Sequence, residues 1–153
     1  MKLAIFDFDG TLFESAGYWT AVISDYVRER GGTPPPDVVG LVKPLGMTLG
    51  AKFFKEQYGL SEEIPEIVRE WRGEMGRHYR LNIPVRKGAR EYIQRLRAMG
   101  ITICMATAME KDFVTAALER TKMRELFDSV VTIADVQANK NSPRIFEYCA
   151  EKY

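Results

Sequence analysis

The sequence has few of the residues that mark disulfide-rich, metal-binding or nucleic-acid-binding proteins. It contains one histidine and two cysteines, Cys104 and Cys149, which stand far apart in apolar surroundings. We therefore expect two buried free thiols and a reducing compartment. Lysine and arginine number 22 against 21 aspartates and glutamates, and the resulting net charge of +1 is too small to attract nucleic acid or an anionic membrane.

Low-complexity tracts, internal repeats and long apolar runs are missing too. The apolar run from Leu3 to Phe8 is too short for a signal-peptide core or a membrane-spanning helix. A chain of 153 residues that is 46% apolar and 28% charged is typical of a globular domain. We expect a cytoplasmic protein.

Apolar periodicity predicts an α/β fold. Strands are expected at Leu3 to Phe8, Ile101 to Ala106 and Phe127 to Ile133. Helices are expected after Gly88, around Phe113 to Leu118 and after Pro143. Alternation of helix and strand indicates a parallel sheet.

A helical insertion separates the first strand from the rest. It is expected to cover residues 15–83, leaving 1–14 and 84–153 as the core. Its expected helices are Ala16 to Arg30, Asp37 to Val42 with an end before Pro44, Leu49 to Tyr58, and a longer one capped by Ser61 and ending near Leu81.

Two aspartates follow the first strand in the run Asp7-Phe8-Asp9-Gly10-Thr11. Open α/β sheets bind ligands at the carboxyl ends of their strands. Two carboxylates there need a cation or a proton to compensate them, which points to a divalent metal with oxygen ligands. Asp9-Gly10 alone is equally well explained as an ordinary turn.

Two later residues favour a phosphate site. Thr107 follows the second strand, so its hydroxyl should emerge beside Asp7, although threonine often caps a helix there. Lys140 lies in the loop after the third strand, where an ammonium could reach the strand ends, although a lone lysine is usually solvated.

In this order the motifs resemble the haloacid dehalogenase superfamily of phosphatases and phosphomutases: Asp-x-Asp-Gly-Thr, then apolar residues ending in Ala-Thr, then Lys-x-x-Pro. The resemblance covers nearly the whole chain and is closest to the β-phosphoglucomutase and phosphoglycolate phosphatase branch. It implies a Rossmann-like core of parallel strands with a small inserted α-helical cap.

The resemblance also implies roles for individual residues. Asp7 would be the nucleophile and Asp9 the general acid and base. Thr107, the backbone amide of Ala108 and Lys140 would hold the phosphate oxygens. Mg²⁺ would bind the Asp7 carboxylate and the Asp9 carbonyl, and the substrate would be a small phosphorylated metabolite.

The sequence departs from the family pattern after Lys140. Asn141 replaces the usual proline, and the acidic strand end that completes the family's metal shell has no counterpart before Tyr153. Glu147 and Glu151 cannot substitute, because both lie on the last predicted helix. We therefore expect a core truncated at its C-terminus, and a first strand whose exposed edge could mediate self-association.

The sequence contains fewer indications of which substrate the protein binds. Lys43, in a segment resembling the cap's substrate loop, could meet the substrate or be a surface lysine. In phosphomutases of the glucose type, which the sequence resembles, a histidine stands where Trp19 stands here. The only histidine of this chain, His78, is expected on a helix surface, so the sequence favours a phosphatase over a phosphomutase. A receiver-type signalling domain phosphorylated on aspartate and an inactive fragment that binds a partner are the alternatives from other classes.

Overall fold

The computed structural model describes residues 2–137 and 142–153. Its sheet has the order β1-β2-β3, formed by β1 (Leu3–Phe6), β2 (Thr102–Thr107) and β3 (Ser129–Thr132). Both pairs are parallel, with Phe6 opposite Met105 and Thr107 opposite Thr132. The predicted parallel α/β fold is confirmed.

The chain divides into two compact units. Unit 1 comprises Met1–Ser15 and Tyr79–Tyr153 and holds the sheet, while unit 2 comprises Ala16–His78 and is helical. The second boundary therefore lies before the expected one at residue 84. The reason is that Tyr79 is fully buried and its ring packs against Phe8 and Phe113 of unit 1.

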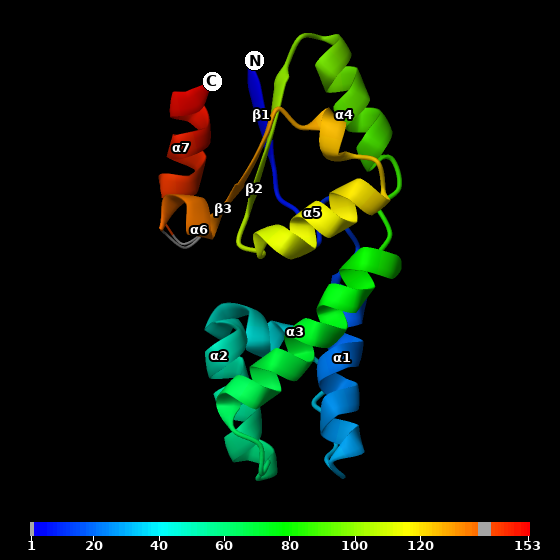
Figure 1. The fold of residues 1–153 in the computed structure, drawn as a ribbon, viewed down its shortest axis with the longest axis vertical. Coiled ribbons are helices and arrows are strands. Elements are labelled where there is room, and N and C mark those ends of the chain that lie inside the picture. The colour runs from blue at the N-terminus through cyan, green and yellow to red at the C-terminus, as the bar shows by residue number, and fades with distance from the viewer. Residues whose placement is uncertain (1, 138–141) are drawn as a thin grey trace. The chain divides into compact units, whose positions relative to one another are not determined.

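Helices cover both faces of the sheet in unit 1. Figure 1 shows α7 (Arg144–Lys152) on one side of the strands and α4 (Ala89–Ala98) on the other. On the α7 side, Ile145 and Cys149 pack with Cys104, Ala106 and Val131 in a core of buried side chains. Helix α5 (Lys111–Arg120) and a short 3-10 helix, Arg124–Leu126, connect β2 to β3. The two cysteines are buried and free, as expected.

Unit 2 is built around a buried tryptophan. It consists of α1 (Ala16–Glu29), α2 (Val38–Tyr58) and most of α3 (Ile64–Leu81), whose last residues belong to unit 1. The Trp71 ring meets the rings of Tyr26 and Phe54 edge to face, with centroids 5.9 and 5.8 Å away. Such edge-to-face pairs stabilise a core beyond the area they bury.

Several element boundaries differ from the sequence-based expectation. One element, α2, spans both expected helices and is broken at Gly46, whose φ of 75° no helix contains, and not at Pro44. Ser61 does not cap α3, because its hydroxyl contacts Glu62, and the amide of Glu63 donates to Glu66 instead. Local hydrogen bonds of this kind decide a helix start more finely than residue type does.

The end of the third expected strand is helical. β3 stops at Thr132, and Ile133–Val136 forms the short helix α6. Thr132 and Asp135 form a reciprocal capping box at its start, in which the Thr132 amide and hydroxyl both donate to Asp135 Oδ2 at 2.8 Å.

The outer edge of β1 is not paired with another strand in the part of the chain that the structure describes. Its four residues, Leu3–Phe6, are partly exposed. Such an edge presents unpaired backbone groups that can accept a further strand. The expected self-association through this edge stays a prediction.

None of the described helices combines the length and apolarity that crossing a membrane requires.

Candidate active site

Asp7 and Thr107 lie at the same edge of the sheet, on neighbouring strands. Asp7 is the first residue after β1, and Thr107 is the last residue of β2. Because β1 and β2 run parallel with Phe6 opposite Met105, the two strands deliver these residues to a common end. The positions of the strand ends in the sequence were therefore enough to predict that the two residues lie at the same end of the sheet.

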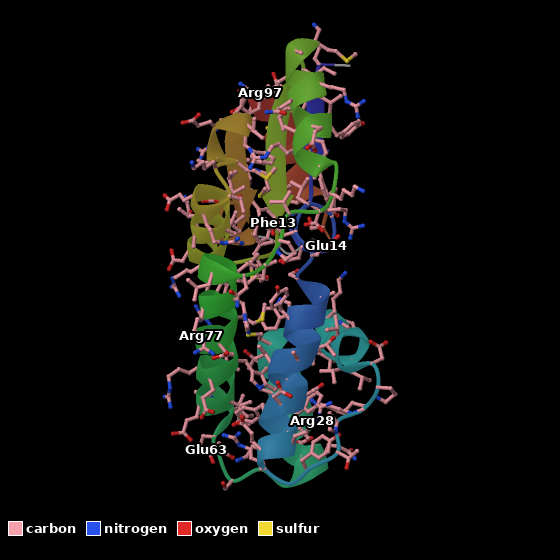
Figure 2. The ribbon with its side chains drawn as sticks, turned by 90° about the vertical axis from the view of Figure 1, so that its right-hand side faces the viewer. Phe13, Glu14, Arg28, Glu63, Arg77 and Arg97 are labelled. Atoms are coloured by element: carbon pink, nitrogen blue, oxygen red, sulfur yellow. The ribbon has the colours of Figure 1, made fainter. Side chains whose placement is uncertain are left out.

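The turn after β1 is fixed by its own backbone. The amides of Leu12 and Phe13 both donate to the carbonyl of Phe8 at 3.0 Å, and the Gly10 amide donates to the Phe13 carbonyl at 2.9 Å. Gly10 has a φ of 73°, a left-handed conformation that glycine adopts at little cost. Phe13, whose side chain is fully buried, is labelled with its neighbour Glu14 in Figure 2.

Arg86 ties this turn to the segment that follows α3. Its guanidinium donates to the Gly10 carbonyl at 2.8 Å, and its backbone amide donates to the Leu12 carbonyl at 2.8 Å. The amide of Glu14 donates in turn to the carbonyl of Pro84 at 3.0 Å. Hydrogen bonds between the turn and the segment from Pro84 to Arg86 therefore hold the backbone after Asp9 in one conformation.

The carboxylates of Asp7 and Asp9 are held differently. Asp7 Oδ1 accepts the amide of Phe8 at 2.8 Å, a local bond within the turn. Asp9 Oδ1 accepts the hydroxyl of Tyr79 at 2.7 Å, across seventy positions of sequence. The orientation of Asp9 therefore depends on a residue that sequence reasoning did not single out.

Thr107 is almost fully buried, and its hydroxyl oxygen accepts the amide of Met109 at 3.0 Å. A hydroxyl that accepts one hydrogen bond still has its proton to donate. The backbone of Ala108, the expected second phosphate ligand, follows directly, at the start of the loop between β2 and α5.

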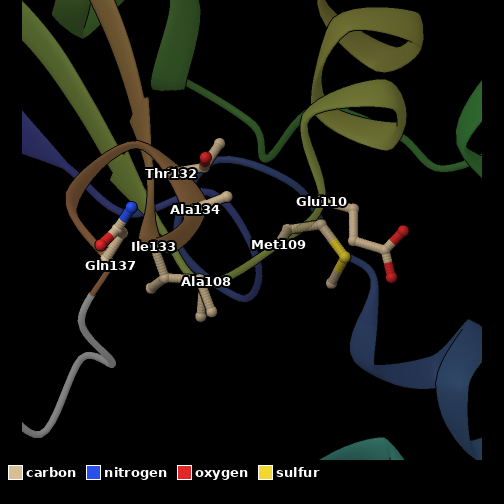
Figure 3. A pocket seen from close by; sticks show the side chains of 7 residues that line it. All are labelled: Ala108, Met109, Glu110, Thr132, Ile133, Ala134 and Gln137. Carbon is tan, nitrogen blue, oxygen red and sulfur yellow. The ribbon is translucent and has the colours of Figure 1, made fainter.

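A shallow apolar hollow of about 450 Å³ adjoins these strand ends. In Figure 3, Ala108 and Ile133 lie close together, with Glu110 and Gln137 on opposite sides. The other lining residues are Met109, Thr132 and Ala134. The hollow is open and mostly apolar, so it offers surface for the carbon skeleton of a ligand more than for its charge.

An ion pair borders the hollow. Lys111 Nζ lies 3.7 Å from Asp135 Oδ1. Burial would raise the pKa of Asp135, but the amide and hydroxyl of Thr132, together with Lys111, hold it below its ordinary value. Lys111 could not be singled out from the sequence, because the position of its partner Asp135 depends on the capping box of α6.

The structure leaves two of the expected site residues untested. Lys140, and Asn141 beside it, lie outside the described residues. Lys43 is an exposed residue of α2 in unit 2. Their proposed contacts with phosphate and substrate stay predictions.

The oxygen donors at the strand end fit Mg²⁺. The Asp7 carboxylate and the Asp9 carbonyl are hard ligands, and magnesium in phosphoryl-transfer sites usually takes only one or two carboxylates and completes its shell with water and substrate. Within residues 2–137 and 142–153, no three histidine, cysteine, aspartate or glutamate side chains gather into a metal-binding group. A set of one carboxylate and one carbonyl suits a site whose shell water and substrate complete.

The whole chain, residues 1–153, matches the family model of haloacid dehalogenase-like hydrolases. The chain belongs to this family. A curated relative from Bacillus subtilis, named "Putative phosphatase YhcW", is 23% identical over 154 residues, which are 99% of this chain and 69% of the relative. The resemblance found in the motifs of the sequence is thereby confirmed.

Solved structures of haloacid dehalogenase-like proteins share the fold. A "putative beta-phosphoglucomutase" from Thermotoga maritima superposes with a TM-score of 0.83 at 19% identity, covering 99% of this chain and 70% of that one. The Bacillus subtilis protein YfnB, solved bound to magnesium, has a TM-score of 0.78 at 13% identity, with 99% and 74% covered. At such identities the likeness establishes the fold.

Proposed function

We propose that this haloacid dehalogenase-like chain hydrolyses a small phosphate monoester, in a magnesium-dependent reaction that passes through an aspartyl-phosphate on Asp7. The observation that carries the proposal is the parallel register of β1 and β2, which places Asp7 and Thr107 at one edge of the sheet. A carboxylate nucleophile and a buried hydroxyl donor at one end of a parallel sheet suit a tetrahedral oxyanion.

In the first half of the proposed reaction, an Asp7 carboxylate oxygen forms a bond to phosphorus while the bond from phosphorus to the ester oxygen breaks. Asp9, protonated at this stage, gives its proton to the departing oxygen, so an alcohol leaves. The Asp9 carboxylate accepts the hydroxyl of Tyr79, whereas that of Asp7 accepts the amide of Phe8, so the two carboxyl groups have different hydrogen-bond donors.

In the second half, a water oxygen forms a bond to phosphorus while the aspartyl oxygen–phosphorus bond breaks. Asp9 takes the proton from the water, and Asp7 is restored as a carboxylate. Thr107 and the amide of Ala108 would donate to the equatorial oxygens, where charge accumulates in a loose transition state. Lys140 would add a positive charge to the same oxygens.

Mg²⁺, held by the Asp7 carboxylate and the Asp9 carbonyl, would supply positive charge that offsets repulsion between the carboxylate and the phosphate dianion. Magnesium bound to the relative YfnB supports this choice of ion. Removing the ion with EDTA should abolish turnover, and added Mg²⁺ should restore it.

The test is turnover of p-nitrophenyl phosphate by this chain. We expect release of inorganic phosphate by the wild type and none above background from Asp7→Asn. Asp112→Asn, at an exposed position in the first turn of α5, is the matched control and should keep full activity. A wild type without turnover, or an active Asp7→Asn variant, would overturn the proposal.

A phosphomutase is the second candidate, favoured by the fold shared with the Thermotoga maritima protein. The chain's only histidine argues for hydrolysis, because His78 pairs with Glu74 at 3.6 Å and packs on the ring of Tyr18 within unit 2. Phosphate release without a bisphosphate activator supports the phosphatase, and strict dependence on such an activator supports the mutase. The family assignment favours an enzyme over a receiver-type signalling domain or an inactive partner-binding fragment.

A further inference from the structure

Tyr79 is the side chain that holds Asp9. Its hydroxyl donates to Asp9 Oδ1 at 2.7 Å, and the residue is fully buried. A hydrogen bond from a neutral donor to a carboxylate is among the stronger bonds in proteins, and burial removes the water that would compete for it. The contact joins the turn after β1 to the end of α3.

The Tyr79 ring is packed against two other aromatic rings. It stacks on Phe113 with centroids 5.3 Å apart and an interplanar angle of 16°, and it contacts Phe8 at 5.7 Å. A tyrosine ring clamped in this way has one orientation in which to present its hydroxyl. The direction of the hydroxyl is therefore set by packing before any substrate arrives.

The Tyr79 backbone is fixed as well. Arg120, the last residue of α5, donates from Nε to the Tyr79 carbonyl at 3.0 Å and from its guanidinium to the Ile83 carbonyl. The Tyr79 carbonyl lies in the last turn of α3 and the Ile83 carbonyl follows that turn, where backbone acceptors lack helical partners. An arginine there stabilises the helix end and keeps Tyr79 in register with Asp9.

We infer that Tyr79 is a positioning residue for the proposed reaction: it holds the Asp9 side chain in the orientation from which a proton passes to the leaving oxygen. The inference rests on the proposed function, since it assigns Tyr79 a role only if Asp9 acts as the acid. Tyr79 does not touch the reacting atoms, and it acts through Asp9 alone. Small misplacements of a catalytic group cost rate without weakening substrate binding.

The sharpest test compares two substrates with Tyr79→Phe, which keeps the ring and removes the hydroxyl. An alkyl phosphate such as glycerol phosphate needs protonation of its leaving oxygen, whereas p-nitrophenolate leaves without it. We expect kcat/KM for the alkyl ester to fall about tenfold or more, and that for p-nitrophenyl phosphate to fall about twofold or less. The loss should lie in kcat, with KM little changed.

Two further variants separate positioning from general damage. Tyr92→Phe removes the hydroxyl of a half-exposed tyrosine on α4 and should change nothing. Asp9→Ala removes the partner, so adding Tyr79→Phe to it should cause no further loss, because residues that act through one group are not additive.

The outcomes distinguish failure of the proposed function from failure of the role proposed for Tyr79. Turnover that survives Asp7→Asn, or no turnover by the wild type, overturns the proposed function and the role of Tyr79 with it. Turnover that depends on Asp7 but falls equally for both substrates in Tyr79→Phe, or falls further in the Asp9→Ala background, overturns the role of Tyr79 alone. A Tyr79→Phe variant with the kcat and KM of the wild type for both substrates also overturns the role of Tyr79.

Discussion

The hydroxyl oxygen of Thr107 accepts the backbone amide of Met109 at 3.0 Å. This bond closes a tight local turn at the end of β2 and fixes the hydroxyl rotor of a residue that is almost fully buried. The hydroxyl still has its proton to donate, and a phosphate oxygen is the acceptor that we propose for it.

Replacing Thr107 by valine, which has the same shape without the hydroxyl, should raise the inhibition constant for inorganic phosphate roughly tenfold, the usual cost of a lost charge-assisted hydrogen bond. Thr107→Ser keeps the hydroxyl and should stay within about threefold of the wild type. The measurement is competitive inhibition of ester turnover by phosphate. Equal inhibition of all three proteins would show that Thr107 does not contact phosphate.

Gly10 should be intolerant of a β-carbon for conformational reasons only. No atom lies within 4 Å of the position that a Cβ would take, but its φ of 73° is left-handed. Gly10→Ala should lower the free energy of unfolding by about 1 kcal/mol, and Gly10→Asn by less, since asparagine tolerates this region better. Denaturant unfolding of the three proteins is the measurement. Equal losses for alanine and asparagine would contradict the conformational explanation.

The start of β2 is held by a carboxylate far from the site. Asp128 Oδ2 accepts the amide of Ile103 at 2.7 Å, and Arg97 reaches both oxygens at 3.2 Å. Figure 2 shows Arg97 at the end of unit 1 remote from Phe13. The Ile103 amide and Arg97 lower the pKa of Asp128, and partial burial opposes them without reversing the shift.

Because the pKa of Asp128 is lower in the folded than in the unfolded chain, its charge stabilises the fold above the unfolded pKa, and this contribution disappears as pH falls through the folded pKa. Asp128→Asn keeps an acceptor for Ile103 and removes the charge. The side chain is 35% exposed, so the variant should be less stable at neutral pH by only about 0.5 kcal/mol. The difference should shrink below about pH 4. A difference that grows on acidification would contradict this sign.

The two thiols should be inert in the folded protein. Burial, and then the neighbouring Cys104, raise the pKa of Cys149 to about 11, and burial also raises the pKa of Cys104. Because the thiolate is the reactive form, an aromatic disulfide reagent at about pH 8 should label neither cysteine until denaturant is added. Rapid labelling of the native chain would show that the α7 side of the sheet opens.

Much of the architecture could be predicted from the sequence because it depends on local pattern. The strands at Leu3 and Thr102 and the helices that begin at Ala16 and Ala89 start within one residue of their expected places. The position of Asp7 and Thr107 at the same end of the sheet followed from the same pattern, since parallel strands end at the same edge. These predictions did not require knowledge of any contact between side chains.

What the sequence could not provide are contacts between distant segments. Tyr79 falls inside a long expected helix and belongs to none of the motifs, and its contact with Asp9 depends on how its ring packs on Phe8 and Phe113. The break of α2 at Gly46 was likewise hidden, because Pro44 two residues earlier is the stronger helix breaker by residue type.

The central claim is that phosphate becomes covalently bound to Asp7, and acid quenching during turnover tests it directly, because acyl phosphates survive acid. Peptide mass spectrometry of the quenched chain should find one phosphoryl group on the peptide that contains Asp7, removed by hydroxylamine and missing from Asp7→Asn. Turnover with a phosphoryl group on another residue, or with none on Asp7 under conditions that trap acyl phosphates, would contradict the account.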